Sequence, residues 1–232
     1  MVQQAPKKSK RETTYKGAAK KKSSGLVPKT AMQGELIKAL KESQQVFILG
    51  PAGTGKTYVT ATHAADLYTA KKIDKIVITR PHVAVGRELG FLKGDLADKT
   101  LPWALPVLDV LEKHLGKGAV ETGVKNGNIE VAPMALMRGR SFENAFIIVD
   151  ETQNITLHEL KMLLTRVGEG TTIVLNGDAQ QSDLKEADGL TKVIHIAKKH
   201  MLPVSIIEFT VDDIVRSDVT AMWVKAFVKE KL

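Results

Sequence analysis

Six short runs of apolar residues recur along the chain, and each has the length of a strand that is buried on both faces. They fall at residues 46–49, 76–79, 129–131, 146–149, 172–175 and 204–209. Several are separated by segments in which apolar residues repeat at helical spacing. Strands that alternate with helices in this way favour an α/β fold with one mostly parallel sheet, flanked by helices on both faces.

Two of the predicted helices begin with the spacing of a capping box, in which residues at the N-cap and three positions later bind each other's backbone. Thr30 and Gln33 have this spacing at the start of a helix over residues 30–42, and Thr156 and Glu159 have it before a later helix. The helices therefore have sequence-encoded starts as well as apolar faces.

Further helices are predicted over residues 58–70 and 190–197 from their apolar spacing. The stretch over residues 81–128 is less regular, and it holds Trp103 flanked by Pro102 and Pro106. We interpret this stretch as an insertion or a surface subdomain.

The positive charge of the chain is concentrated at its start. Of the 34 basic and 26 acidic residues, nine basic and one acidic lie within residues 1–30, which leaves 25 of each in the rest. Residues 1–29 contain almost no large apolar side chain, so we expect a basic, disordered tail before a single domain over residues 30–232. Because the body is formally neutral, a globally basic nucleic-acid-binding fold is excluded.

The composition excludes several further classes of protein. The chain has 232 residues, of which 43% are hydrophobic, and it has no cysteine, which excludes disulfides and thiolate metal sites. No apolar run approaches the roughly 18 residues that a membrane-spanning helix needs. No apolar segment of a secretory signal follows the charged start. We therefore expect a cytoplasmic protein without a membrane partner.

The segment after the first apolar run fits the pattern G-x-x-x-x-G-K-[ST] of a phosphate-binding loop. Glycines let the backbone wrap tightly enough to aim several N–H groups at phosphate oxygens, and the following helix adds its positive end. Lys56 would reach the β and γ phosphates, and the Thr57 hydroxyl would bind Mg²⁺. The predicted nucleotide-binding residues here are Gly50, Pro51, Ala52, Gly53, Thr54, Gly55, Lys56, Thr57 and Tyr58.

Hydrolysis of a bound nucleotide needs carboxylates beside this loop. Two candidates, Asp150 and Glu151, follow the apolar run at residues 146–149. Asp150 could hold Mg²⁺ through water, and Glu151 could orient and deprotonate the attacking water. The carboxyl ends of neighbouring parallel strands line one crevice, so Glu151 and Lys56 can meet there despite their separation in sequence.

Further motifs surround these two and closely resemble the PhoH-like family of ATPases over roughly residues 28–220. They are Asp150-Glu151-Thr152-Gln153-Asn154, Gly177-Asp178-Ala179-Gln180-Gln181-Ser182-Asp183-Leu184, Thr79-Arg80-Pro81, Gly90-Phe91-Leu92-Lys93-Gly94-Asp95-Leu96 and Met137-Arg138-Gly139-Arg140. The resemblance implies a P-loop NTPase with a single RecA-like core related to superfamily 1 helicases. It also implies ATP as ligand and RNA metabolism as the setting.

The resemblance implies roles for several polar residues. Gln33 would contact adenine, and Gln153 and Gln181 would sense the γ phosphate. Asp178 would be part of the link between those two glutamines. Arg216 is similar to the family's late arginine, so it would act as an arginine finger that neutralises charge developing on the transferred phosphoryl group.

Simpler interpretations stay open for some of these residues. Gln33 has the alternative role of capping-box partner of Thr30. Arg80, Arg138 and Arg140 are candidates for contacts with nucleic acid or nucleotide, and the alternative is that they form surface ion pairs with carboxylates.

The chain has room for one RecA-like domain, whereas a superfamily 1 helicase closes two such domains on one ATP. Arg216 must therefore fold back onto its own site or reach the site of a neighbour. The second option predicts a ring-shaped homo-oligomer, and we favour a hexamer.

The leading hypothesis is Mg²⁺-dependent ATP hydrolysis coupled to remodelling of RNA or another single-stranded nucleic acid. One alternative is a nucleotide-gated nucleic-acid-binding protein with negligible turnover, and another is a P-loop kinase. The basic tail could bind nucleic-acid phosphates without sequence preference, or it could be a solvated extension.

Overall fold

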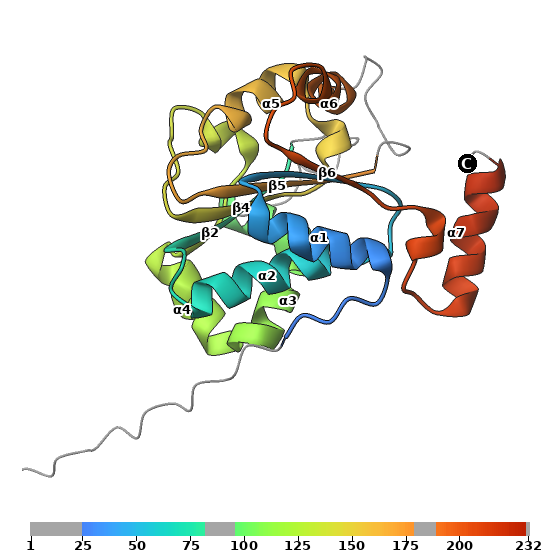
Figure 1. The fold of residues 1–232 in the computed structure, drawn as a ribbon. Coiled ribbons are helices and arrows are strands. Elements are labelled where there is room, and N and C mark those ends of the chain that lie inside the picture. Colours follow the sequence, from blue (N-terminus) through green and yellow to red (C-terminus); the bar gives the residue numbers. More distant parts are fainter. Residues whose placement is uncertain (1–24, 82–95, 179–188, 231–232) are drawn as a thin grey trace, which may run out of the picture.

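A computed structural model describes residues 25–81, 96–178 and 189–230 of the chain, and within these ranges six strands form one sheet (Figure 1). The strands are β1 (Gln45–Leu49), β2 (Lys75–Thr79), β3 (Ile129–Val131), β4 (Ala145–Val149), β5 (Thr172–Gly177) and β6 (Ser205–Glu208). The helices are α1 (Ala31–Glu42), α2 (Lys56–Thr69), α3 (Leu96–Leu115), α4 (Lys117–Asn126), α5 (Leu157–Leu164), α6 (Gly189–Lys199) and α7 (Asp218–Glu230). Short 3-10 turns form η2 (Met134–Met137), η3 (Thr152–Asn154) and η4 (Val211–Asp213).

The strand order is β3-β2-β4-β5-β1-β6, and every pairing in the sheet is parallel. All six strands predicted from apolar runs are confirmed, and so is the α/β class. Leu49 pairs with Gly177 and Val149 pairs with Leu175, so β1, β5 and β4 end at one edge of the sheet. The loops that follow these three strands are thereby brought together.

Helices cover both faces of the sheet (Figure 1). On one face, α1, α2, α3 and α4 enclose a core that includes Phe146 and Ile148 of β4. On the other face, η2, α5 and α6 enclose a core that includes Ile147 and Val149 of the same strand. Burial on both faces explains why the strands are continuous apolar runs rather than alternating ones.

The interpretation of residues 81–128 as an insertion or surface subdomain is wrong for the described part of that stretch. Here α3 and α4 pack against the sheet as part of its helical layer, and Pro102 and Pro106 both lie inside α3. The buried side chains Ala104, Val107, Leu108 and Leu111 follow helical spacing. The two prolines obscured this pattern because proline usually ends a helix. Residues 82–95 lie outside the described residues.

Both predicted capping positions mark helix starts, but only the second forms a complete capping box. Thr30 accepts a hydrogen bond from the N–H of Gln33 at 3.2 Å, and Thr156 and Glu159 form the complete reciprocal pair before α5. The predicted tail overlaps the described residues only from residue 25, and Leu26 packs against the core beside α1. Among the helices that the structure describes, none is long and apolar enough to cross a bilayer.

The place of α3 in the core can be tested by truncating a buried leucine. Leu111 is fully buried, so Leu111→Ala should lower the free energy of unfolding by about 2–5 kcal/mol through lost burial and a cavity. Leu105, on the same helix, is 46% exposed, and Leu105→Ala should change it by no more than about 0.5 kcal/mol. Urea unfolding of both variants measures the difference. Equal effects would contradict the packing of this helix face.

Candidate nucleotide-binding site

The predicted phosphate-binding loop connects β1 to α2, and its backbone conformation requires glycine. Gly50 and Gly53 have φ angles of 128° and 90°, which side-chain-bearing residues rarely adopt. A Cβ at Gly50 would clash with the carbonyl oxygen of Phe209, and one at Gly53 would lie 2.9 Å from the Arg216 side chain. The loop is thus shaped both by its own dihedral angles and by the segment that follows β6.

Polar contacts hold the loop in place before α2 begins. The Thr54 hydroxyl donates to the carbonyl of Pro51 at 3.1 Å. The Gln33 side chain donates to the carbonyl of Thr54 at 2.9 Å and accepts from the N–H of Lys29 at 2.8 Å. The amide of Gln33 therefore ties the start of α1 to the loop, a role that neither the adenine contact nor the simple capping interpretation includes.

Lys56, the first residue of α2, folds back over its own loop. Its Nζ donates to the carbonyl oxygens of Gly50 at 2.5 Å and Pro51 at 2.8 Å. Burial lowers the pKa of Lys56, while the negative charges of Asp178, Asp150 and Glu151 act in the opposite direction. The ammonium is partly buried and held by neutral carbonyls, and none of the ion pairs among the described residues uses it, so it is available to bind an anion such as phosphate.

Asp150 and Glu151 follow β4 and face this loop. The N–H of Asp150 donates to the carbonyl of Thr79 at 3.0 Å, which extends the pairing of β4 with β2. Burial raises the pKa of Asp150, and the neighbouring Glu151 carboxylate raises it further. Glu151 adopts a left-handed conformation, with φ 55° and ψ 41°, which is uncommon for a residue with a side chain and often occurs at functional sites.

Gln153, in the turn η3, connects the ends of two strands. Its amide nitrogen donates to the Glu151 carboxylate at 2.6 Å, and its amide oxygen accepts the N–H of Asp178 at 3.0 Å. Glu151 follows β4 and Asp178 follows β5, so one side chain sets both positions. This geometry explains how the strained Glu151 is held, and it places Gln153 and Asp178 together as the sequence resemblance implies.

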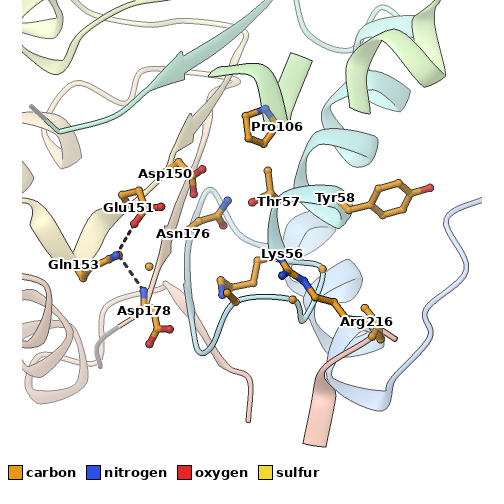
Figure 2. Close-up of a pocket in the computed structure, with 15 residues that line it drawn as sticks. Lys56, Thr57, Tyr58, Pro106, Asp150, Glu151, Gln153, Asn176, Asp178 and Arg216 are labelled. Atoms are coloured by element: carbon orange, nitrogen blue, oxygen red, sulfur yellow. Dashed lines mark hydrogen bonds between the residues drawn. The ribbon is translucent and has the colours of Figure 1, made fainter. Parts of the chain in front are cut away.

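These groups surround a cavity of about 470 Å³ at the carboxyl edge of the sheet. Figure 2 shows Asp150 and Glu151 on one side of it and Thr57 on the other, with Asn176 between them. The cavity is lined by Ala52, Gly53, Gly55, Lys56, Thr57, Tyr58, Pro106, Asp150, Glu151, Gln153, Asn176, Gly177, Asp178, Val215 and Arg216. The loop, the carboxylates and the late arginine thus meet in one place.

Arg216 lies against its own phosphate-binding loop. The N–H of the preceding residue, Val215, donates to the carbonyl of Gly53 at 3.0 Å, and the Arg216 side chain lies over Gly53. The sequence left two options open for Arg216, its own site or the site of a neighbour. In this structure Arg216 folds back onto its own site.

Asn176 is a site residue that sequence reasoning missed. It lies in β5 next to Ile48 of β1, is only 1% exposed and lines the cavity. Neither polar atom of its side chain has a hydrogen-bond partner among the residues that the structure describes. An amide interrupting the end of an otherwise apolar strand was the available indication, because burying unpaired polar atoms is costly unless a ligand binds them.

A second cavity, of about 480 Å³, opens beside the loop between α1 and α2. Tyr58 and His114 line it with ring centroids 6.1 Å apart, and the Thr62 hydroxyl lies 3.1 Å from the His114 ring nitrogen. Gln33 borders it as well, although its amide contacts backbone atoms. His114 was not predicted because it comes from α3, which the sequence did not reveal as a helix.

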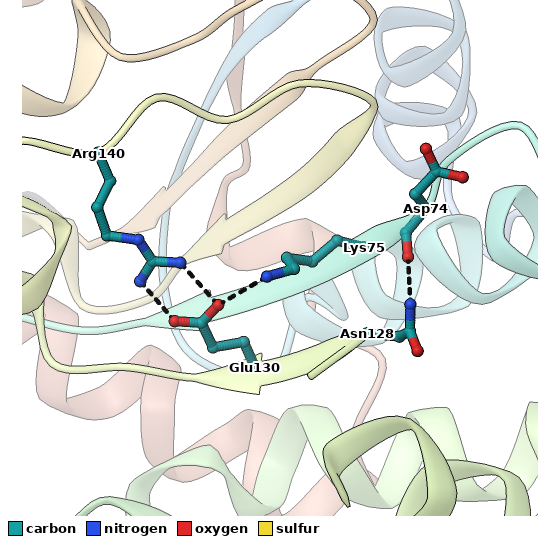
Figure 3. Close-up of polar contacts among 5 residues, drawn as sticks. All are labelled: Asp74, Lys75, Asn128, Glu130 and Arg140. Carbon is teal, nitrogen blue, oxygen red and sulfur yellow. Dashed lines mark hydrogen bonds and ion pairs between the residues drawn. The ribbon is translucent and has the colours of Figure 1, made fainter. Parts of the chain in front are cut away.

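The three arginines proposed for nucleic acid or nucleotide contacts have different surroundings. Arg140 forms a two-pronged ion pair with Glu130, which also binds Lys75 at 3.2 Å (Figure 3). The surface ion pair is therefore the correct interpretation for Arg140. Arg80 follows β2, and its positive charge acts on Asp150 to lower the pKa of that carboxyl against the effects of burial.

Arg138 is exposed and borders shallow cavities beside α5. Gln181 lies outside the described residues, so its implied part in sensing the γ phosphate stays a prediction.

A parallel sheet with a glycine-rich loop after β1 and carboxylates after β4 defines a P-loop NTPase. The chain belongs to the PhoH-like protein family, whose sequence model matches residues 25–228. The resemblance inferred from separated motifs is thereby confirmed.

Individual relatives agree with this membership. The chain is 40% identical over 198 residues to protein PhoH of Escherichia coli K12, a match covering 84% of this chain and 56% of the relative. It is 40% identical over 205 residues to a PhoH-like protein of Bacillus subtilis, covering 87% of this chain and 64% of the relative. The chain thus spans less than two thirds of the length of these curated relatives.

The fold also resembles that of a large terminase from a thermophilic bacteriophage. The TM-score is 0.52 with 13% sequence identity, over 85% of this chain and 50% of that protein. At this identity the similarity concerns the fold, and it supports the P-loop NTPase architecture.

The raised pKa of Asp150 predicts a cost in stability. The folded protein binds a proton at this carboxyl more tightly than the unfolded chain does, so the cost in stability is absent below the ordinary pKa of aspartate, grows as the pH rises from there, and is complete above the raised pKa. Asp150→Asn removes this charge and should raise the Tm of the nucleotide-free protein at pH 7 by about 2–4 °C. The gain should shrink at about pH 4, nearer the ordinary pKa of aspartate, where Asp150 of the unmodified protein is partly protonated.

Calorimetry at both pH values measures this effect. The matched control is Asp109→Asn on the exposed side of α3, which should shift the Tm by less than about 1 °C at either pH. A Tm that falls for Asp150→Asn at pH 7 would contradict the assigned electrostatics.

Proposed function

We propose that this chain hydrolyses ATP with Mg²⁺. The observation that carries the proposal is the convergence of the loop lysine, Lys56, with Asp150 and Glu151 around a single cavity of about 470 Å³. The backbone N–H groups of the loop and the N-terminus of α2 suit the β phosphate. Lys56 would exchange its two loop carbonyls for phosphate oxygens when the nucleotide binds.

The residues beside the loop fit a magnesium ion. Thr57 offers a hydroxyl and Asp150 a carboxylate, both hard oxygen donors that line the same cavity. Mg²⁺ is usually bound by one or two carboxylates together with substrate phosphates and water. When bound with ATP, it supplies positive charge that stabilises the phosphoryl oxygens.

We assign Glu151 the role of orienting and deprotonating the attacking water. The hydrogen bond from Gln153 leaves the carboxylate a limited range of orientations, and the same amide contacts the backbone at Asp178. A shift of β5 relative to β4 would move the Glu151 carboxylate through this amide, which supports a sensing role for Gln153. Gln181 is proposed as the second sensor on the basis of the family resemblance.

We assign the base of ATP to the second cavity, which adjoins the loop at Gly55. The Tyr58 and His114 rings offer apolar faces on which a purine can stack. Gln33 would act there mainly by holding the loop, because its amide already contacts the carbonyl of Thr54.

We propose that Arg216 completes its own site, since the Val215 to Gly53 hydrogen bond fixes it beside the loop. Its guanidinium would neutralise charge that develops on the γ phosphate. This differs from a superfamily 1 helicase, in which a second domain supplies that arginine.

We propose that turnover is coupled to RNA or another single-stranded nucleic acid. The support is membership of the PhoH-like family, together with the basic residues concentrated in residues 1–30.

Glu151→Gln should separate binding from hydrolysis. Loss of the general base should reduce phosphate release by about 10²–10⁴-fold while ATP binding is kept, because the amide preserves the shape of the side chain. Phosphate release and calorimetric ATP titration measure the two effects. Glu121→Gln, an exposed change on α4, is the control and should leave both unchanged.

Three outcomes would contradict this assignment. Equal rates for Glu151→Gln and the unmodified protein would remove Glu151 from its role. Tight ATP binding without turnover, even with Mg²⁺ and RNA present, would indicate a nucleotide-gated binding protein. ADP formed without free phosphate, and only with an added acceptor, would indicate a P-loop kinase.

We also propose that copies of the chain associate, with a hexameric ring as the favoured form. The support is the apolar stripe of α7, which stands apart from the helices that cover the sheet (Figure 1). Its members are Val219, Met222, Trp223 and Phe227, which are 47–69% exposed. The Trp223 and Phe227 rings stack with centroids 5.5 Å apart, so the stripe is an ordered surface that a second copy could cover.

Light scattering with ATP and Mg²⁺ should give a mass well above the 25.3 kDa of one chain. Trp223→Lys should reduce it toward that value, because the change places a charge inside the proposed contact. Glu230→Gln, an exposed change on the same helix, is the control and should leave the mass unchanged. A monomeric wild-type protein that still hydrolyses ATP would refute the association.

A further inference from the structure

Basic side chains gather on the outer surface of α5, away from the nucleotide site. His158 and Lys161 lie on its exposed side, one turn apart. Arg166 follows the helix, and Arg138 approaches from the turn after η2. All four line one shallow cavity of about 270 Å³, together with Met162 and Thr165. We call this set of four basic residues the α5 basic surface.

The charges of Arg138, Lys161 and Arg166 are not paired with a carboxylate within the described part of the chain. The ion pairs found there use the basic residues Lys75, Arg140, Lys198 and Lys225, none of which belongs to the α5 basic surface. The Nε atom of Arg166 is buried and has no hydrogen-bond partner among the described residues, so this guanidinium is not held by a neighbouring acceptor at that atom.

The neighbouring acidic group is already engaged. Glu159 lines the adjoining cavity of about 210 Å³, but its carboxylate accepts hydrogen bonds from the N–H and hydroxyl of Thr156 in the capping box. Arg140, two residues after Arg138, points instead to Glu130 at the edge of the sheet. The intervening Gly139 has φ 77°, which turns the chain between the two arginines. Among the residues that line the two cavities, Arg138, Lys161 and Arg166 outnumber the single carboxylate of Glu159, so positive charge is in excess beside α5.

The shape and chemistry of this surface fit a chain of phosphates. The two cavities share Arg138, His158 and Met162, so together they form one continuous open depression. Arginine guanidiniums pair well with phosphate oxygens.

We propose that the α5 basic surface binds the phosphate backbone of single-stranded nucleic acid. This inference rests on the proposed function, because it names where the nucleic acid lies on the body of the protein. Binding here requires no sequence preference, since the contacts are made to phosphates rather than to base edges.

The surface is joined to the catalytic residues by a short length of ordered chain. Glu151 and Gln153 lead through the fully buried Ile155 to Thr156, the N-cap of α5. His158 and Lys161 lie on the first turns of that helix. A strand bound on α5 would therefore contact the helix that follows Glu151 and η3 in the chain, and we propose that nucleic acid acts on the hydrolytic site through this connection.

The test compares two double variants that lose the same charge. Arg138→Gln with Lys161→Gln removes two exposed cations of the α5 basic surface and leaves the partly buried Arg166 in place. Lys38→Gln with Lys125→Gln removes two exposed cations on α1 and α4, on the opposite face of the sheet. Each full-length protein is titrated into a fluorescently labelled single-stranded RNA at several salt concentrations, and anisotropy reports binding. ATPase rates are measured with and without RNA.

The α5 double variant should bind RNA about tenfold more weakly at low salt. The slope of log K against log salt should fall by about 1.4, because each phosphate contact contributes about 0.7 on a single strand. Its ATPase rate without RNA should be unchanged, and any stimulation should need about tenfold more RNA. The control variant should match the unmodified protein in affinity and slope.

Equal RNA affinity and equal salt slope for the α5 variant and the control would overturn the proposed site. If the unmodified protein still bound RNA in that case, the proposed coupling of turnover to nucleic acid would stand. An unmodified protein that hydrolyses ATP but binds neither RNA nor single-stranded DNA would overturn both the site and that coupling. Displacement of RNA by polyglutamate, with the same dependence on Arg138 and Lys161, would assign the surface to an acidic protein instead.

Discussion

Parallel pairing of β1, β5 and β4 is the constraint on which the site depends. It brings the loop after β1, Asp178 after β5 and Glu151 after β4 to one edge of the sheet. The order of these strands in space differs from their order in sequence, so residues about a hundred positions apart become neighbours. Gln153 then fixes the fine geometry by binding both the Glu151 carboxylate and the backbone at Asp178.

The phosphate-binding loop lies in a formally neutral body, so its proposed affinity for phosphate depends on local arrangement rather than on net charge. Lys56 is partly buried, and two carbonyl oxygens of the loop hold its ammonium against the loop. Asp150 has a raised pKa because it is buried next to Glu151. The site thus maintains an unfavourable charge arrangement within a well-packed fold, as is common where a protein must bind a charged ligand.

The environment of each arginine decides what it can do. Arg140 is neutralised by Glu130 at the sheet edge, and Arg216 is held over Gly53 by the backbone of its neighbour. Arg138 and Arg166 have no carboxylate partner in the described part of the chain, and they border the same depression beside α5. A motif such as Met137-Arg138-Gly139-Arg140 therefore contains one structural arginine and one available for binding.

The sequence by itself determined the six strands, the phosphate-binding loop and the carboxylates after residue 149, because apolar runs and glycine spacing are local properties of the chain. It did not show that α3 belongs to the core, since two prolines masked its apolar face. Only the tertiary structure decided that Asn176 and His114 line the cavities, that Gln33 holds the loop, and that Arg140 is paired while Arg138 is not. These facts depend on contacts between residues far apart in sequence, and the spacing of residues along one chain does not encode which distant partner each side chain meets.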